Sequence, residues 1–245
     1  MSPRLLLLAV AGVVAAACSS APMLTAPAPV TPMESPAPVP SPSPSPAPVP
    51  DPVARYLVTF QSDWSRATHP TDWPDDAHYS GLIGGTHSSR VSFWQDGQLA
   101  SAGIQLMAEK GRKSPLDQEV LAAIAAGNAQ FLLSGDGLSG SPRSVSLEFD
   151  VSVTFPLVTL VTMVAPSPDW FVGVSGLSLL PNGQWANELT ATLFPWDAGT
   201  DSGVTYAAEN LATVPPGPIH RLVGFPVAVN GAVAPFGTMT FKRLK

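Results

Sequence analysis

The sequence predicts an antiparallel β-sandwich with one or two short inserted helices, and three observations support that class. Residues 144–153 alternate strictly between polar and apolar side chains, as a half-buried antiparallel strand does. Residues 157–164 form a nearly continuous apolar run, which suits a strand buried on both faces. Helical segments do not alternate with strands along the chain, so a parallel α/β sheet is excluded.

The remaining strands are expected in segments that clusters of proline, asparagine and glycine separate. Short strands are predicted at 55–60 and 238–241, and longer ones at 171–180 and 188–194. In the strand at 144–153, one row of apolar side chains is expected to face the core. That row comprises Val145, Leu147, Phe149, Val151 and Val153.

Two short helices are expected between the strands. The first is predicted to have Ser114 as its cap, Pro115 at its first position and Gly127 just past its end. One face of this helix is expected to be apolar. The face comprises Leu116, Val120, Leu121 and Ile124. A second candidate covers residues 100–110 and ends at Gly111.

Composition excludes one broad class of partner. Apolar residues make up 45% of the 245 residues and charged residues only 12%, so the chain has ample material for a core. The formal net charge is −6, and the few basic residues are scattered except at residues 242–245. Nucleic-acid binding requires clustered lysine and arginine, so we expect no nucleic-acid partner.

The first 17 residues are predicted to be an export signal. Arg4 supplies a positive charge, residues 5–14 are apolar, and three alanines at 15–17 provide a small-residue cleavage site. Cys18, the single cysteine of the chain, follows directly. This order resembles a bacterial lipobox, in which the cysteine is lipidated, although Ala15 stands where leucine is usual. The alternative is a secretory signal that is cleaved nearby and leaves a free thiol.

Residues 18–52 are predicted to be a lipid-anchored linker rich in proline, serine and alanine. Thirteen of the 32 residues from 21 to 52 are proline, which excludes helix and sheet. At about 3.1 Å per residue in an extended polyproline form, this linker would reach roughly 100 Å. Ser19, rather than aspartate, follows the lipidated cysteine, which favours the outer membrane or cell surface. The globular domain is expected at 53–245.

Three aspartates form the best candidate metal site. Asp169, Asp197 and Asp201 lie among glycines and aromatic residues between 165 and 203, and the last two are four residues apart in one loop. Calcium takes several oxygen ligands, which such loops supply from carboxylates and backbone carbonyls. The alternative is that these aspartates only form turns by bonding their own backbone.

Three histidines suggest a different site. His69, His78 and His87 recur at intervals of nine in a region rich in loops and aspartate, and imidazoles bind transition metals. No metalloprotease-type histidine pair and no Gly-x-Ser-x-Gly nucleophile turn accompanies them. Because these motifs are lacking, we assign no catalytic residue. An envelope hydrolase that uses the histidine-rich loops is kept as the alternative function.

Several sequence blocks match a known family. The longest are residues 165–173 and 195–203, and shorter ones lie at 68–70, 91–94 and 234–238. Through these blocks the globular part resembles the spondin N-terminal domain, which is known from extracellular matrix proteins. The resemblance covers residues 53 to about 242.

The resemblance implies a C2-like β-sandwich of about eight strands with one bound Ca²⁺. The ligands that it implies are Asp169, Asp197 and Asp201. Trp196 stands where tyrosine is common in the family. Trp170 and Trp196 lie beside the candidate ligands in sequence, so they are candidates for a rim that faces a ligand; the alternative is core packing.

Together these features predict a non-enzymatic, calcium-binding adhesion or recognition module that is anchored at the cell surface or envelope. The partner classes we expect are a polysaccharide, a phospholipid headgroup or a surface protein. A passive structural subunit of the envelope is the remaining alternative.

Overall fold

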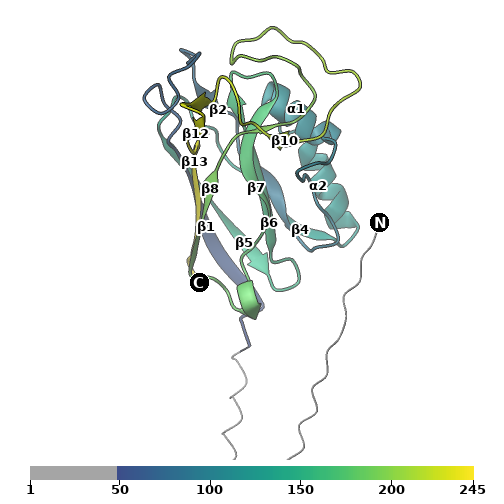
Figure 1. Ribbon diagram of the computed structural model, residues 1–245. Helices are drawn as coiled ribbons and strands as arrows, with labels where there is room; N and C mark the ends of the chain where they lie inside the picture. The colour runs from purple at the N-terminus through teal and green to yellow at the C-terminus, as the bar shows by residue number, and fades with distance from the viewer. Residues whose placement is uncertain (1–48) are drawn as a thin grey trace, which may run out of the picture. The chain divides into compact units, whose positions relative to one another are not determined.

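The computed structural model describes residues 49–245, which form two antiparallel sheets with helices against one of them (Figure 1). The predicted all-β sandwich with two short helices is confirmed. The described part of the chain contains eight strands of five or more residues. The predicted signal peptide, Cys18 and the linker up to residue 48 lie outside the described residues.

The first sheet has four strands in the order β5, β1, β13, β8. These strands are β5 (Ser144–Ser152), β1 (Val53–Ser62), β13 (Gly237–Arg243) and β8 (Glu188–Leu193). The first and last long strands of the domain pair directly at its centre, where Phe60 lies opposite Met239. Every second residue of β1, from Ala54 to Phe60, is fully buried, so this face of the sheet forms one side of the core.

The second sheet has seven strands. Its main order is β10 (His220–Arg221), β9 (Trp196–Asp197), β7 (Trp170–Ser178), β6 (Leu157–Ala165), β3 (Ile83–His87) and β4 (Ala129–Ser134). The short strand β2 (His78–Tyr79) also pairs with β6. Outside both sheets lie the ribbon of β11 (Ala228–Val229) with β12 (Ala232–Val233) and the 3₁₀ turn η1 (Pro181–Gly183).

Two hydrophobic clusters explain why the second sheet is buried on both faces. Leu160 of β6 and Val172 of β7 face the first sheet and join its core. Their neighbours Val161 and Phe171 point the other way, toward the helices. Figure 1 shows α1 (Ala102–Lys110) and α2 (Leu116–Ala125) on that outer side. The apolar run of β6 is therefore a strand covered on both faces, as its sequence predicts.

The helices differ in detail from the prediction. In α2 the N-cap is Pro115, not Ser114, and no side chain caps the helix. Leu121 is 51% exposed, so its predicted place on the apolar face was wrong. Leu116 and Val120 do face the core. The helix α1 begins after Ser101, whose side chain accepts a hydrogen bond from the amide of Ile104.

The strand predictions were wrong about the end of one strand and missed two others. The strand β5 ends at Ser152, and Val153 is partly exposed beyond it. The sequence analysis also missed β3 and β4. Gly84 and Gly85 of β3 carry no side chain that could reveal a pattern, and a Cβ on Gly84 would lie 2.0 Å from the carbonyl oxygen of Thr159 in β6. Glycine is thus required there for close pairing of the two strands.

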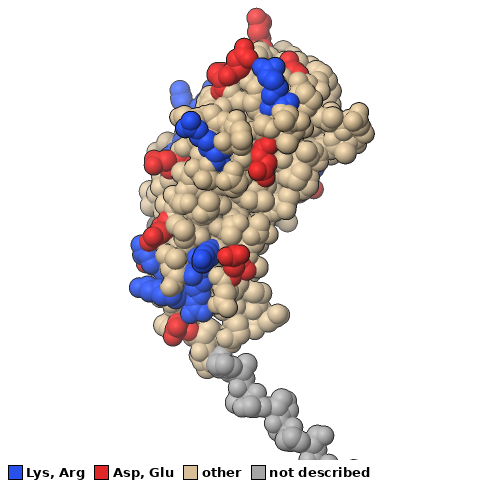
Figure 2. All heavy atoms as spheres, turned by 90° about the vertical axis from the view of Figure 1, so that its left-hand side faces the viewer, with Lys and Arg blue, Asp and Glu red and all other residues tan. Residues whose placement is uncertain are grey.

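The outward face of the four-stranded sheet carries paired charges. Arg55 lies 3.1 Å from both Glu148 and Asp150, and Arg243 lies 3.5 Å from Asp51. Figure 2 shows basic and acidic side chains beside one another on this side of the molecule. Such exposed pairs contribute little to stability. Among the described residues, neither helix has the length and apolarity needed to cross a bilayer.

Candidate metal centre

Strand pairing brings two of the three predicted aspartates together. Asp169 directly precedes β7, and Asp197 belongs to β9. These strands pair with Trp170 opposite Asp197, and the amide of Ala198 donates a hydrogen bond of 3.1 Å to the carbonyl oxygen of Asp169. Two carboxylates that are 28 positions apart in the sequence therefore lie at one end of the second sheet.

The side chain of Asp169 is the centre of the site. Its Oδ2 accepts hydrogen bonds from the backbone amides of Thr200, at 2.7 Å, and Asp201, at 3.0 Å. The hydroxyl of Thr200 donates a third bond to the same oxygen. The other oxygen, Oδ1, is buried without a hydrogen-bond partner among the described residues. A buried carboxylate oxygen in that state is costly unless a ligand satisfies it.

The electrostatics of Asp169 and Asp197 also favour a bound cation. Burial, together with the neighbouring charge of Asp197, raises the pKa of Asp169 to about 6, against the three hydrogen bonds that lower it. Burial also raises the pKa of Asp197. In the absence of a cation, two ionised carboxylates at this place destabilise the folded chain. A divalent cation would relieve both the repulsion and the unsatisfied oxygen.

A tight loop holds Asp197 in place. Its Oδ1 accepts a hydrogen bond of 2.7 Å from the amide of Gly199, and it lies 3.8 Å from Nδ1 of His220. Gly199 has φ +74°, and a Cβ on it would lie 2.4 Å from the carbonyl oxygen of Gly217. Only glycine fits this close contact between the two loop segments.

Asp201 behaves differently from the other two aspartates. Its carboxylate accepts hydrogen bonds from the amides of Gly203, at 2.8 Å, and Leu211, at 3.2 Å. It therefore holds the loop together in the way that aspartate commonly does in turns. No group of three or more His, Cys, Asp or Glu side chains within residues 49–245 is arranged to hold a metal ion. The carboxylates thus form a pair with Asp201 nearby, and backbone oxygens would have to complete a calcium shell.

A hollow of about 240 Å³ opens beside Asp197 and Asp201. Asp197, Asp201 and His220 line it, together with Gly199, Ser202, Thr213, Gly217 and Pro218. The side chain of Asp197 is only 14% exposed, whereas that of His220 is 56% exposed. The carboxylate of Asp197 is therefore sheltered at the edge of this hollow, whereas Asp169 is fully buried behind it and does not line it. We find that the residues present fit a bound cation.

The two tryptophans beside the aspartates have different surroundings. Trp170 is 1% exposed and packs edge-on against Tyr206, with 5.1 Å between the ring centroids. It therefore belongs to the core and leaves no open face for a ligand. Trp196 is half-buried and lines a separate surface pocket with Arg221. Of the two rim candidates, only Trp196 faces an open space.

The three predicted histidines each bind structural partners. His69 is buried, and its Nε2 lies 3.2 Å from the carbonyl oxygen of Ala234. His87 is also buried, between the carbonyl oxygen of Ser88 and the hydroxyl of Thr159. Burial lowers the pKa of both rings, which favours the neutral form. Each of these two rings therefore has structural hydrogen-bond partners, His69 beside Ala234 and His87 at the end of β3.

His78 has the same kind of role. Its Nδ1 lies 2.6 Å from the carbonyl oxygen of Asp76, two residues earlier. The intervals of nine in the sequence place the three histidines on different structural segments, and within residues 49–245 they do not gather at a common site.

Comparison with known proteins identifies the family of the domain. The spondin N-terminal domain (Spondin_N) matches residues 54–242. The chain belongs to the spondin N-terminal domain family. Spondin-2 of Rattus norvegicus is 34% identical over 209 residues, which cover 79% of this chain and 63% of that protein. Spondin-1 of Homo sapiens is 38% identical over 175 residues, which cover 69% of this chain but only 22% of that protein.

This spondin domain thus spans less than two thirds of the relatives that it matches. The sequence singled out the block that contains Asp169 and Asp197, and the structure pairs the segments that carry these two residues. It does not reveal Thr200 as a hydrogen-bond donor to Asp169, or His220 as a neighbour of Asp197, because both contacts depend on pairing between distant segments. The hydroxyl of Thr200 lies inside the matched block, so the block itself was the available signal. His220 had no such signal in the sequence.

Proposed function

We propose that this chain is a calcium-binding adhesion or recognition module of the cell envelope. One observation carries the proposal: Oδ1 of Asp169 is buried, unpartnered among the described residues and next to the carboxylate of Asp197. Calcium would be held by the side chains of Asp169 and Asp197, with Asp201 and backbone oxygens of its loop as the remaining candidates. The ion would supply positive charge that fixes the loops around it.

The domain family supports the functional class. Spondin N-terminal domains occur in Spondin-1 and Spondin-2, and we extend from them the role of an extracellular adhesion or recognition domain. Calcium sites of extracellular modules commonly have dissociation constants of about 10⁻⁴–10⁻³ M, which suits a structural ion outside the cell. Non-enzymatic binding is the activity that such a domain would provide.

Anchoring completes the proposal. Lipidation of Cys18 would attach the chain to the outer membrane or cell surface, and the proline-rich residues 18–52 would hold the domain away from it. A single acyl chain binds membranes only marginally, whereas the several chains of a lipoprotein act together. Metabolic labelling with palmitate tests this part. Incorporation in the parent and its loss in a Cys18→Ser variant are expected, and labelled Cys18→Ser protein would contradict the assignment.

The calcium site is tested by titration calorimetry on the exported chain with Cys18→Ser, after dialysis against EDTA. We expect one Ca²⁺ per chain in the parent and none in Asp169→Asn. Asp136→Asn is the matched control, because Asp136 is not buried and the change in charge is the same. Equal calcium binding by parent and Asp169→Asn would refute the site.

Recognition is tested separately from calcium binding. The same protein is mixed with beads of acidic polysaccharide and with phospholipid vesicles. Each mixture is prepared once with a calcium concentration above about 10⁻³ M and once with EDTA. Binding to either surface supports a recognition role. Calcium binding without any surface binding would leave a passive structural role as the function.

A further inference from the structure

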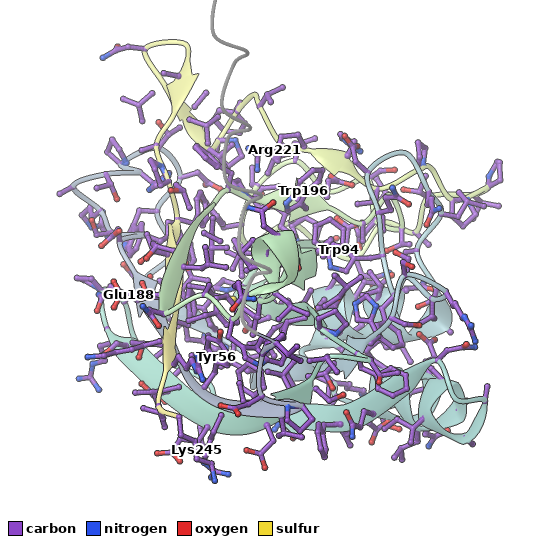
Figure 3. All side chains as sticks on the ribbon, turned by 90° about the horizontal axis from the view of Figure 1, so that it is seen from below. Tyr56, Trp94, Glu188, Trp196, Arg221 and Lys245 are labelled. Carbon is purple, nitrogen blue, oxygen red and sulfur yellow. The ribbon has the colours of Figure 1, made fainter. Side chains whose placement is uncertain are left out.

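A second hollow lies on the other face of the short β9–β10 ladder. Its volume is about 470 Å³, within the range of small-ligand sites. Trp94, Trp196, Phe194 and Arg221 line it, and residues of the segment 89–96, without Arg90 and Phe93, form one side. Figure 3 shows Arg221, Trp196 and Trp94 in succession, and the rings of Trp94 and Trp196 meet edge to face at 5.1 Å.

The guanidinium of Arg221 is held in this pocket by aromatic rings. Its central carbon lies 4.3 Å from the ring centroid of Phe194 and 5.0 Å from that of Trp196. Stacking of this kind fixes a planar guanidinium and leaves its edge N–H groups free. Among the residues that the structure describes, no side chain forms a hydrogen bond or ion pair with this guanidinium within the usual distances. Arg221 is therefore a pre-positioned cation without an anionic partner in the described part of the chain.

Neutral polar groups and one carboxylate surround the cation. Gln95 and Asp96 are exposed at the pocket, and Asp96 lies near enough to act on the charge of Arg221 without forming an ion pair with it. The indole N–H of Trp94 is buried with no hydrogen-bond partner in the described part of the chain. Ser92 and Ser175 both donate hydrogen bonds to the carbonyl oxygen of Trp94 and so fix the position of that residue.

We propose that this pocket binds one acidic sugar unit of a polysaccharide, with the sugar carboxylate on Arg221. A carboxylate matches the two parallel N–H donors that a stacked arginine presents. The partly exposed rings of Phe194 and Trp196 form an apolar part of the lining against which a sugar ring would lie, although the guanidinium covers one side of each ring. Gln95 and Asp96 are exposed at the pocket and provide acceptors for sugar hydroxyls.

The lining argues against a densely charged ligand. Arg221 is the single lysine or arginine that lines the described pocket, and Asp96 would repel a second negative charge. One sugar unit with a single carboxylate and otherwise neutral hydroxyl groups fits this balance better than a polyphosphate, and the comparison with an acidic peptide is left to the experiment. The inference deepens the proposed recognition function and rests on it only for the choice of a polysaccharide as partner.

The pocket and the candidate metal centre share the same ladder. Asp197 pairs with His220, and the adjacent residues Trp196 and Arg221 pair with each other. Successive residues of a strand point to opposite faces, which explains why the first pair lines the metal hollow and the second lines this pocket. The two sites use different side chains, so they can be tested independently.

Calorimetry with a glucuronate oligosaccharide tests the proposal on the exported chain with Cys18→Ser. The neutral control ligand is the same oligosaccharide with its carboxylates reduced to alcohols. We expect binding in EDTA, and a loss of about 10- to 100-fold in affinity in Arg221→Gln, because a hydrogen bond to a charged group contributes about 1.5–3 kcal/mol. Reduction of the ligand carboxylates should cause a loss of similar size.

Two further variants test whether the loss of affinity comes from the position and the shape of the Arg221 side chain. Arg112→Gln removes the same charge from a position just after α1 that lies outside the pocket, and it should bind as the parent does. Arg221→Lys keeps the charge but not the planar fork, so an intermediate affinity is expected. A thermal melt of each variant shows whether it is folded.

Three results would overturn the inference. The first is unchanged affinity in folded Arg221→Gln or Arg221→Lys. The second is binding that requires calcium and is lost in Asp169→Asn, because the carboxylate would then sit on the ion. The third is equal or tighter binding of a hexaglutamate peptide. Calcium titration without sugar reports separately on the proposed metal site, so failure of either proposal is recognisable.

Discussion

Replacing Asp169 by asparagine is expected to remove a pH-dependent loss of stability from the metal-free protein. The folded-state pKa of Asp169 is about 6, compared with an ordinary value of 3.8. Because the pKa is raised by folding, the stabilising contribution is fully present below the unfolded pKa and is lost as pH rises through the folded one. A shift of about two units corresponds to roughly 3 kcal/mol of lost stability at neutral pH.

The part of this stability loss that can be measured without acid unfolding lies between about pH 4.5 and pH 7.5. Linkage assigns about 2 kcal/mol to that interval, since the unfolded chain has already begun to ionise at its lower end. The amide that replaces the carboxylate does not titrate, so this loss should be absent from the Asp169→Asn variant. The buried amide adds a cost of about 1–3 kcal/mol, but that cost does not depend on pH and cancels in the comparison.

The assay is thermal or urea unfolding in EDTA at both pH values, for the parent and for Asp169→Asn. Between the lower and the higher pH the parent should lose about 4–8 °C more in melting temperature than the variant, at about 2–4 °C per kcal/mol for a domain of this size. At the higher pH, calcium at about 100 times its dissociation constant should restore about 2.7 kcal/mol to the parent and nothing to the variant.

The control is Asp136→Asn, which should follow the parent at both pH values because its carboxylate lies outside the core. Identical pH dependence in the parent and Asp169→Asn would refute the reasoning, since it would mean that Asp169 ionises in the folded chain as easily as in water. A calcium response that survives in Asp169→Asn would show that the ion binds without this carboxylate.

Three other substitutions test separate parts of the structure. Gly199→Ala should destabilise the metal-free domain by about 1–3 kcal/mol, because its φ is positive and the added Cβ meets the carbonyl of Gly217; a melt in EDTA that matches the parent would contradict this packing. Leu116→Ala should cost about 2–5 kcal/mol and Leu121→Ala less than about 0.5 kcal/mol in urea unfolding, and equal costs would contradict the observed orientation of α2. Phe60→Ala should cost about 3–5 kcal/mol in the same assay, because the ring is fully buried between the sheets; a cost below about 1 kcal/mol would place it outside the core.

The sequence by itself determined the long strands. Alternation in β5 and continuous apolar character in β6 are local patterns, and each states how many faces of a strand are buried. The end of α1 at Gly111 was equally local, since a residue with φ +63° favours glycine. The loop block that contains Asp169, Asp197 and Asp201 was also evident, because its residues match those of the spondin family in order.

Only the tertiary structure decided which side chains meet. It brought Asp169 to Asp197 by pairing β7 with β9, turned Asp201 toward the amides of its own loop, and buried Trp170 in the core. The pocket at Arg221 was likewise absent from any sequence pattern. Contacts of this kind depend on register between segments that lie far apart in the chain, and a local pattern carries information about burial but none about the partner that provides it.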